Sequence, residues 1–391
     1  MPSVAIIGAG PSGCYVAQAL CKARADAAIT IFDALPVPYG LIRYGVAADH
    51  QGTKAVIRQF ERLFERQGVR FAGNVRLGAD VTLDALRAGF DAVVLATGLG
   101  ADRRLGIPGE DLAGIHGAGE VTRAWNGYPD AVAPPIGRRV VVLGNGNVAI
   151  DLVRILAKGA AEFEGSDITG EPGAGVEEIT IVGRSAATVA RFDPVMVKEL
   201  ARLAGCRIAV LGAEGEGKGI EALQSLHGHA PEGAAKSLTF RFGLTPLRFL
   251  GDTAVKGVEF SDGTVIFADT VLTAIGFEGD AARDVLLADA SEEGVLAPGL
   301  YATGWFRRGP RGTIPENRAD ALALATRIAA DLPRDGGKPG IDVPGMTGFD
   351  GWVRIDAAER AAAPEGRVRA KITTHAGLMA LAQNTGETGC K

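Results

Sequence analysis

Two glycine-rich turns of the same pattern constrain this chain more than any other feature. The first, Gly8-Ala9-Gly10-Pro11-Ser12-Gly13, follows the apolar run 4–7, and the second, Gly144-Asn145-Gly146-Asn147-Val148-Ala149, follows the apolar run 140–143. In such a strand–turn–helix unit the first Gly permits a tight turn, the second lets the backbone approach a pyrophosphate, and the small third residue allows close packing. The pyrophosphate lies at the helix N-terminus, whose free N–H groups favour negative charge. Two such turns predict an α/β protein that holds two dinucleotides, most commonly a flavin and a nicotinamide.

Length and charge agree with an α/β protein of this kind. A chain of 391 residues predicts two or three domains that are stable without disulfides. The net charge of −5 argues against nucleic acid as the main partner. No apolar run approaches the roughly 20 residues needed to cross a bilayer, so no membrane span is expected. Because a core strand begins almost at Met1, we expect no signal or transit peptide, and a location in the bacterial cytoplasm or an organelle matrix.

The cysteines exclude one class of two-dinucleotide enzyme. Cys14, Cys21, Cys206 and Cys390 form no Cys-x-x-Cys pair and show no metal-ligand spacing. Disulfide reductases need a pair of reactive thiols, so that chemistry is not expected here. We expect no metal site either.

Asp33 indicates which dinucleotide the first turn holds. It follows the expected strand 28–32 and stands 20 positions after Gly13. A carboxylate there fits a ribose hydroxyl and repels a 2′-phosphate, which favours FAD or NAD over NADP. The alternative is a helix cap or a solvated strand end.

Further along, an amphipathic helix is expected between His50 and Glu65. Apolar runs that end in Gly, at 92–98, 270–276 and 300–304, are expected where the chain passes between domains.

Three blocks of the sequence resemble the adrenodoxin reductase family, the ferredoxin–NADP⁺ reductases built like glutathione reductase. They are Pro38 to His50, Leu143 to Leu156, and Gly304 to Ile314, and they occur in family order. The tail 348–382 also resembles the family's C-terminus, while the stretches 159–176 and 212–236 are interpreted as variable surface loops.

The resemblance implies two Rossmann-like, three-layer dinucleotide-binding domains. The FAD domain is expected in two pieces, residues 1–105 and 298–391, with the NADP domain, residues 106–297, inserted between them. The amides that precede an expected helix at 316–330 are interpreted as facing the flavin, where they stabilise its anionic reduced ring. For Trp305 the alternative is a core aromatic side chain. The family's flavin contacts correspond here to Gly8, Gly10, Ser12, Gly13, Asp33, Leu41, Arg43, Val81, Trp305, Gly312, Thr313 and Ile314.

The nicotinamide site is expected at the second turn, on Gly144, Asn145, Gly146, Asn147 and Val148. Arg184 and Ser185 follow the expected strand 178–182, where a guanidinium suits a 2′-phosphate and no carboxylate is present to hold a free ribose. The family usually has two adjacent arginines here, so we expect weaker discrimination against NADH. Arg103 and Glu199 match further nicotinamide-nucleotide contacts, although each also fits a solvated charge.

His50 and Asp151 are the expected catalytic pair. The resemblance places His50 near the flavin and close to Asp151, where the two side chains could position the nicotinamide, relay a proton or help couple the two domains. A purely structural role for His50 is the alternative.

The resemblance implies that NADPH reduces FAD, which passes single electrons to an iron–sulfur ferredoxin, expected to be of the 2Fe–2S type. That ferredoxin would serve a cytochrome P450 or an oxygenase. Arg307, Arg308, Arg311 and Arg318 are expected to guide it to the cleft, although some of them could instead be structural and pair with the NADP domain. Two alternatives remain: an electron-feeding subunit of a larger complex, and a non-catalytic dinucleotide-binding sensor.

Overall fold

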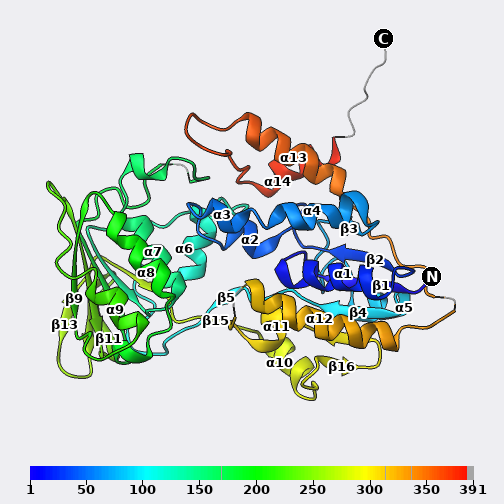
Figure 1. Ribbon diagram of the computed structural model, residues 1–391, viewed down its shortest axis with the longest axis horizontal. Helices are drawn as coiled ribbons and strands as arrows, with labels where there is room; N and C mark the ends of the chain where they lie inside the picture. Colours follow the sequence, from blue (N-terminus) through cyan, green and yellow to red (C-terminus); the bar gives the residue numbers. More distant parts are fainter. Residues whose placement is uncertain (169, 313, 336, 385–391) are drawn as a thin grey trace, which may run out of the picture.

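Two α/β domains lie side by side in the computed structural model, which describes residues 1–168, 170–312, 314–335 and 337–384 (Figure 1). The two ends of the chain build one domain, and the middle of the chain builds the other. No helix in these ranges is both long and apolar enough to span a bilayer.

The first domain is built on a six-stranded sheet in the order β16-β17-β4-β1-β2-β3. Its strands are parallel except for β16, which runs antiparallel to β17 at one edge. Central strands of such a sheet are covered on both faces, which explains why they read as continuous apolar runs. The bounds are β1 Ser3–Ile7, β2 Ala28–Phe32, β3 Arg70–Ala72, β4 Ala92–Leu95, β16 Val295–Ala297 and β17 Leu300–Ala302.

Helices cover this sheet, and α12, the longest of them, packs against α1. The C-terminal helices α13 and α14 lie over α2 and α4 (Figure 1). The bounds are α1 Pro11–Ala23, α2 Gly40–Tyr44, α3 Gln51–Lys54, α4 Ile57–Arg66, α5 Leu83–Gly89, α10 Ala281–Leu287, α11 Gly304–Arg308, α12 Ile314–Asp331, α13 Phe349–Ala361 and α14 His375–Gln383.

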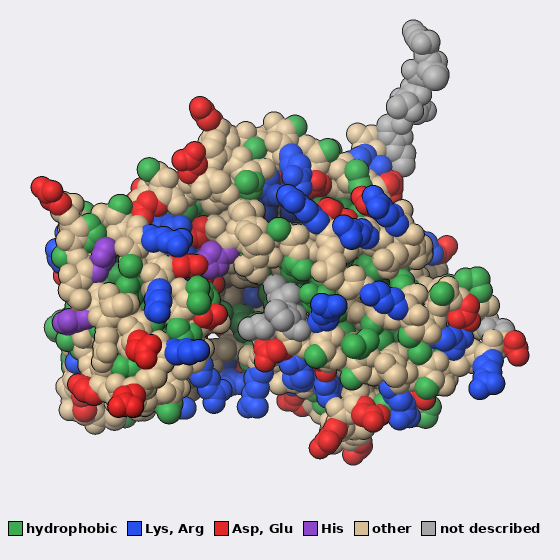
Figure 2. All heavy atoms as spheres, viewed as in Figure 1, with side chains coloured by type: hydrophobic (Ala, Val, Ile, Leu, Met, Phe, Trp, Pro, Cys, Tyr) green, Lys and Arg blue, Asp and Glu red, His purple; other side chains and the backbone are tan. Residues whose placement is uncertain are grey.

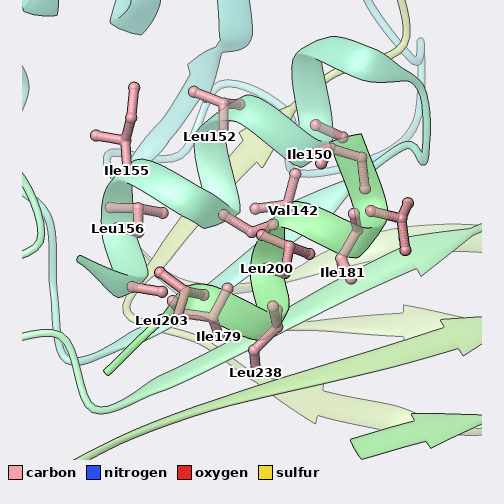
Figure 3. Close-up of a cluster of buried hydrophobic side chains, with 14 of the residues drawn as sticks. Val142, Ile150, Leu152, Ile155, Leu156, Ile179, Ile181, Leu200, Leu203 and Leu238 are labelled. Atoms are coloured by element: carbon pink, nitrogen blue, oxygen red, sulfur yellow. The ribbon is translucent and has the colours of Figure 1, made fainter. Parts of the chain in front are cut away.

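The second domain has a parallel six-stranded sheet in the order β6-β14-β7-β8-β10-β9. Figure 3 shows its core, where Ile150 and Leu156 of α7 meet Val142, Ile181 and Leu238 of the sheet. A small antiparallel sheet, β11-β12-β13, packs nearby. The strands are β6 Ile115–Gly117, β7 Arg139–Leu143, β8 Glu178–Gly183, β9 Cys206–Leu211, β10 Lys236–Phe242, β11 Pro246–Gly251, β12 Val255–Phe260, β13 Val265–Phe267 and β14 Thr270–Thr273. The helices are α6 Ala118–Trp125, α7 Asn147–Ala157, α8 Pro194–Glu199 and α9 Lys218–Gln224, with 3₁₀ turns η1 Ala160–Phe163, η2 Ala187–Val189 and η3 Leu200–Arg202.

The two connections between the domains pair with each other. β5 (Ala101–Asp102) runs antiparallel to β15 (Phe277–Glu278), forming a two-stranded ribbon. Because α10 and β16 follow this ribbon and β16 joins the first sheet, the expected boundary at residue 297 falls inside the first domain. We propose that the chain returns to the first domain at β15.

Two expectations about local structure were wrong in part. The helix expected between His50 and Glu65 is split into α3 and α4, since the turn at 55–56 separates them. The stretch 212–236, expected to be a surface loop, contains α9, whose Ile220 and Leu223 are buried in the second core. Apolar residues at helical spacing were the overlooked signal.

Candidate functional site

The first glycine of each turn adopts a similar backbone conformation with a positive φ. Gly8 has φ +111° and Gly144 has φ +120°, a region that residues with a Cβ rarely adopt. A Cβ on Gly8 would lie 2.5 Å from the carbonyl oxygen of Ala96, and one on Gly144 would lie within 3.0 Å of that of Ala274. In each domain the turn is therefore pressed against the strand at which the sheet order reverses, where α/β proteins bind dinucleotides.

The second glycine of each turn faces open space. A Cβ on Gly10 or Gly146 would meet no atom within 4 Å. These residues are the N-caps of α1 and α7, and neither helix start is capped by a side chain. Asn147 and Val148 open α7, and the third small residue, Ala149, is fully buried. Free helix N–H groups beside open space fit a pyrophosphate at both sites.

Asp33 follows the neighbouring strand β2, and its carboxylate binds the backbone of the first turn. Its Oδ2 accepts from the N–H of Ala9 at 2.8 Å and its Oδ1 from the N–H of Leu35 at 3.0 Å. Burial raises the pKa of Asp33 to about 6, although the two N–H donors favour its charged form. The carboxylate thus holds the backbone of the turn, and its contact with a ribose stays a prediction.

The corner after β17 lies against the start of α1. Gly304, with φ +63°, packs on Ser12 so closely that a Cβ would lie within 3.0 Å of the serine side chain. Ser12 Oγ donates to Asn317 Oδ1 of α12 at 3.2 Å. Gly312 is exposed with φ +89°, Ile314 begins α12, and Thr313 lies outside the described residues.

Trp305 presents an unsatisfied donor near the ribbon between the domains. Its Nε1 is buried and has no hydrogen-bond partner among the residues that the structure describes. Its ring lies 5.5 Å from that of Phe277 on β15. Because a buried indole N–H normally finds an acceptor, this donor fits a bound ligand, and the residues present here fit a flavin.

Three other residues expected at the flavin lie in the first domain, but the side chain of Arg43 is engaged elsewhere. Arg43 is 2% exposed, and its Nη2 donates to Glu359 of α13 at 2.5 Å. Its guanidinium also lies over the ring of Trp352. Leu41 lies beside it on α2, and Val81 is buried in the core. The side chain of Arg43 therefore ties α2 to α13, and any contact of Leu41, Arg43 or Val81 with flavin stays a prediction.

His50 lies between two carboxylates of the second domain. Its Nδ1 is 3.7 Å from Asp151 Oδ1 on α7, and its Nε2 is 3.3 Å from Glu199 Oε2 at the end of α8. The expected proximity of His50 and Asp151 is therefore observed, and Glu199 joins them. Burial raises the pKa of Asp151, while the charges of Arg154 and His50 oppose that shift. The imidazole thus connects the loop of one domain to helices of the other.

Asp49, next to His50, anchors the same loop. Its carboxylate accepts from Arg154 Nε at 2.9 Å, from Arg154 Nη2 at 2.8 Å and from Lys158 Nζ at 2.7 Å. These contacts lower the pKa of Asp49 strongly despite its burial. Sequence reasoning gave Asp49 and Arg154 no role, although both fall within the quoted blocks.

Arg184 and Ser185 lie where β8 ends, beside the second turn. Both are exposed, and the side chain of Arg184 makes no hydrogen bond or ion pair with any described residue. A Cβ on Gly183 would lie within 3.0 Å of the Asn145 amide, which shows that the two segments touch. Arg103 is exposed just after β5, in the ribbon between the domains, where its N–H donates to the Gly276 carbonyl at 3.0 Å. Arg184 is thus available to a ligand held by the second turn.

The described residues offer neither metal nor disulfide chemistry. They contain no group of three or more His, Cys, Asp or Glu that could hold a metal ion. Cys14, Cys21 and Cys206 are free thiols, and burial raises the pKa of Cys206 to about 11, far from a reactive thiolate.

Several known proteins are similar to this chain both in sequence and in three-dimensional structure. Residues 2–212 match the model of the pyridine nucleotide-disulphide oxidoreductase family, which is more than half of the chain. The chain belongs to this family. It is 42% identical to the cindoxin reductase of Citrobacter braakii, covering 98% of this chain and 92% of that protein. It is 31% identical to NADPH-ferredoxin reductase FprA of Mycobacterium tuberculosis, over 97% of this chain and 98% of that protein.

A mitochondrial relative and a solved structure extend the likeness. NADPH:adrenodoxin oxidoreductase of Arabidopsis thaliana is 31% identical over 97% of this chain and 95% of its own length. The structure of Mycobacterium tuberculosis FprA in complex with NADPH has a TM-score of 0.87 at 29% identity, covering 98% of this chain and all of that one. The chain is thus a two-domain dinucleotide-binding oxidoreductase, and its resemblance to the adrenodoxin reductase family is confirmed.

Proposed function

We propose that this protein is an FAD-dependent ferredoxin–NADP⁺ reductase, which passes electrons from NADPH to a small electron-carrier protein one at a time. The observation that carries the proposal is the pair of equivalent turns, each with an open second glycine and an uncapped helix start. The named relatives support it, since several are NADPH-dependent reductases of ferredoxin or adrenodoxin.

The first turn, with Asp33 and Trp305, is assigned to FAD, and the second turn, with Arg184, to NADP(H). Bound FAD supplies the redox chemistry, because a flavin takes up a hydride and releases electrons singly. The protein's own residues bind and orient the two dinucleotides. The uncapped starts of α1 and α7 hold the pyrophosphates, and His50 lies between Asp151 and Glu199 where the domains meet. We propose that His50 positions the nicotinamide, and that Asp151 and Glu199 orient the imidazole.

The partner is proposed to be an acidic iron–sulfur ferredoxin of the 2Fe–2S type that serves a cytochrome P450 or an oxygenase, in the bacterial cytoplasm or an organelle matrix. Arg307 and Arg308 are poor candidates for its docking site, because both pair with Asp320 of α12. Arg311 is exposed, and Arg318 is exposed on α12.

A second group of cations lies on α4. Arg58, Arg62 and Arg66 are exposed at spacings of four residues, and none is within 4.0 Å of a carboxylate among the described residues. Figure 2 shows Lys and Arg side chains gathered on this face of the first domain, and a hollow between the two domains. We propose that the carrier approaches from this side, where complementary charge speeds encounter.

Anaerobic stopped-flow mixing with NADPH tests the proposed function. The flavin absorbance should bleach rapidly, and the reduced enzyme should then reduce a 2Fe–2S ferredoxin under steady-state conditions. Persistence of the flavin band in excess NADPH would support the sensor alternative. Rapid bleaching without transfer to any free carrier would favour an electron-feeding subunit. The cysteine content speaks against that subunit, whose known representatives carry cysteine-rich cluster-binding segments.

A further inference from the structure

Lys371 is a buried cation at the junction of three parts of the chain. It belongs to the segment between α13 and α14, which reaches from the first domain toward the second (Figure 1). Its side chain is 4% exposed. Burial of an ammonium is costly unless each of its donors finds a partner, so the partners of Lys371 indicate its role.

Those partners come from both domains. Lys371 Nζ donates to the carbonyl of Arg43, on α2 of the first domain, at 3.0 Å. It also donates to the carbonyl of Asn126, at the end of α6 in the second domain, at 2.9 Å. Asp167, also in the second domain, lies 2.9 Å away. One ammonium group therefore joins the flavin-side helix α2 to two segments of the nicotinamide domain.

A second buried lysine shares the same carboxylate. Lys54 Nζ lies 3.0 Å from Asp167 Oδ2 and 2.6 Å from Asn126 Oδ1. Burial lowers the pKa of Lys371 and of Lys54, while Asp167 favours their charged forms. The backbone continues the junction, since the N–H of Asp167 donates to the Ala48 carbonyl at 3.2 Å. The loop that carries His50 is thus fixed to the second domain on this side as well.

We propose that Lys371 is a positioning residue for hydride transfer, whose ammonium holds the nicotinamide domain in register with the flavin domain. This inference rests on the proposed function. Transfer between two separately bound dinucleotides requires them to meet in one geometry, and a displacement of about 1 Å can slow such a reaction about 100-fold. Lys371 touches neither turn, so its removal should change the rate of transfer more than the affinity for either dinucleotide.

Lys236 offers a matched control. Its Nζ donates to three backbone carbonyls, those of Leu156 at 3.0 Å, Lys158 at 3.1 Å and Gly173 at 2.9 Å, and lies 3.6 Å from Glu171. All four partners belong to the second domain. Lys236→Met therefore removes a largely buried ammonium and its hydrogen bonds without releasing one domain from the other.

The test compares Lys371→Met and Lys236→Met with the wild-type protein. Flavin reduction at saturating NADPH is followed by stopped flow, and NADP⁺ is added to the reduced protein to measure its long-wavelength charge-transfer absorbance. Lys371→Met should reduce flavin at least about tenfold more slowly and lose most of that absorbance. Its FAD content and its Kd for NADP⁺ should stay within about threefold of wild type. Lys236→Met should keep the wild-type rate.

If Lys371→Met does not fold, Lys371→Gln, which keeps an NH2 donor group but not the positive charge, is measured against the same criteria. A reduction rate equal to that of Lys236→Met would overturn the inference, and so would a loss confined to FAD content or NADP⁺ affinity. Failure of the wild-type protein to oxidise NADPH would instead reject the proposed function.

Discussion

The second glycine turn allows folding and coenzyme binding to be perturbed separately. At Gly146 the backbone has φ −84° and an added Cβ meets no atom within 4 Å. Gly146→Ala should therefore fold normally, and could gain about 0.4–1 kcal/mol because alanine restricts the unfolded chain. At Gly144, φ is +120° and the Cβ would press on the Ala274 carbonyl. Gly144→Ala should lose at least about 1–3 kcal/mol from backbone strain alone.

The effect on binding follows from where the Gly146 methyl would lie. It occupies the open space through which a pyrophosphate approaches the start of α7. Loss of one hydrogen bond from an N–H to a charged phosphate oxygen costs about 1.5–3 kcal/mol. The Kd for NADP⁺ should therefore rise about 10- to 150-fold.

The assay combines thermal unfolding, calorimetric titration with NADP⁺ and release of bound FAD. FAD content serves as the internal control, because the first turn is unchanged in both variants. Gly146→Ala should keep its unfolding temperature and its FAD while losing NADP⁺ affinity. Wild-type affinity for NADP⁺ in Gly146→Ala would refute the assignment of the second turn to NADP(H). A loss of stability equal to that of Gly144→Ala would refute the inference that the Gly146 methyl points into open space.

Three further predictions concern charged residues. In urea unfolding, Asp49→Asn should lower the free energy of unfolding by about 3 kcal/mol, because Arg154 then loses a buried partner. The control variant Asp26→Asn, which breaks an exposed ion pair with Arg24, should lower it by less than about 1 kcal/mol. Since the folded pKa of Asp49 is lowered, its contribution is present above about pH 4 and is lost as the pH falls further, so the mutant should show a shallower acid dependence of stability. Arg184→Ala should raise the KM for NADPH about 10- to 100-fold more than that for NADH, and equal effects would show that Arg184 does not contact the 2′-phosphate. Arg311→Glu should slow ferredoxin reduction, most strongly at low salt, while NADPH-dependent reduction of ferricyanide is unchanged; salt-independent rates would exclude this docking surface.

Local signals were sufficient for the turns and for the strands around them. Gly8 and Gly144 are needed where φ is positive, and the apolar runs before them became β1 and β7, because both requirements act within a few residues. The neighbourhood of His50 and Asp151 came from family resemblance instead. Spacing alone could not have placed side chains from two domains together.

The buried charges were not predictable in this way. In the sequence, Lys54 and Lys371 resemble solvated surface lysines, since a local pattern does not distinguish a buried cation from an exposed one. Their burial depends on partners far along the chain, such as the Arg43 carbonyl, which is 328 positions from Lys371. For the same reason Arg307 was assigned to a docking surface, although Asp320 holds it in place.

The sequence by itself determined that two dinucleotides are bound, because the conformational freedom of glycine and the polarity of a helix start are local properties. Only the tertiary structure decided how the two sites face each other. That relation depends on the ribbon of β5 and β15, on His50 between two carboxylates, and on Lys371 between two domains. Each of these contacts forms only when distant segments of the chain fold together. A charged side chain is stable in the interior only where hydrogen-bonding or oppositely charged partners replace its water.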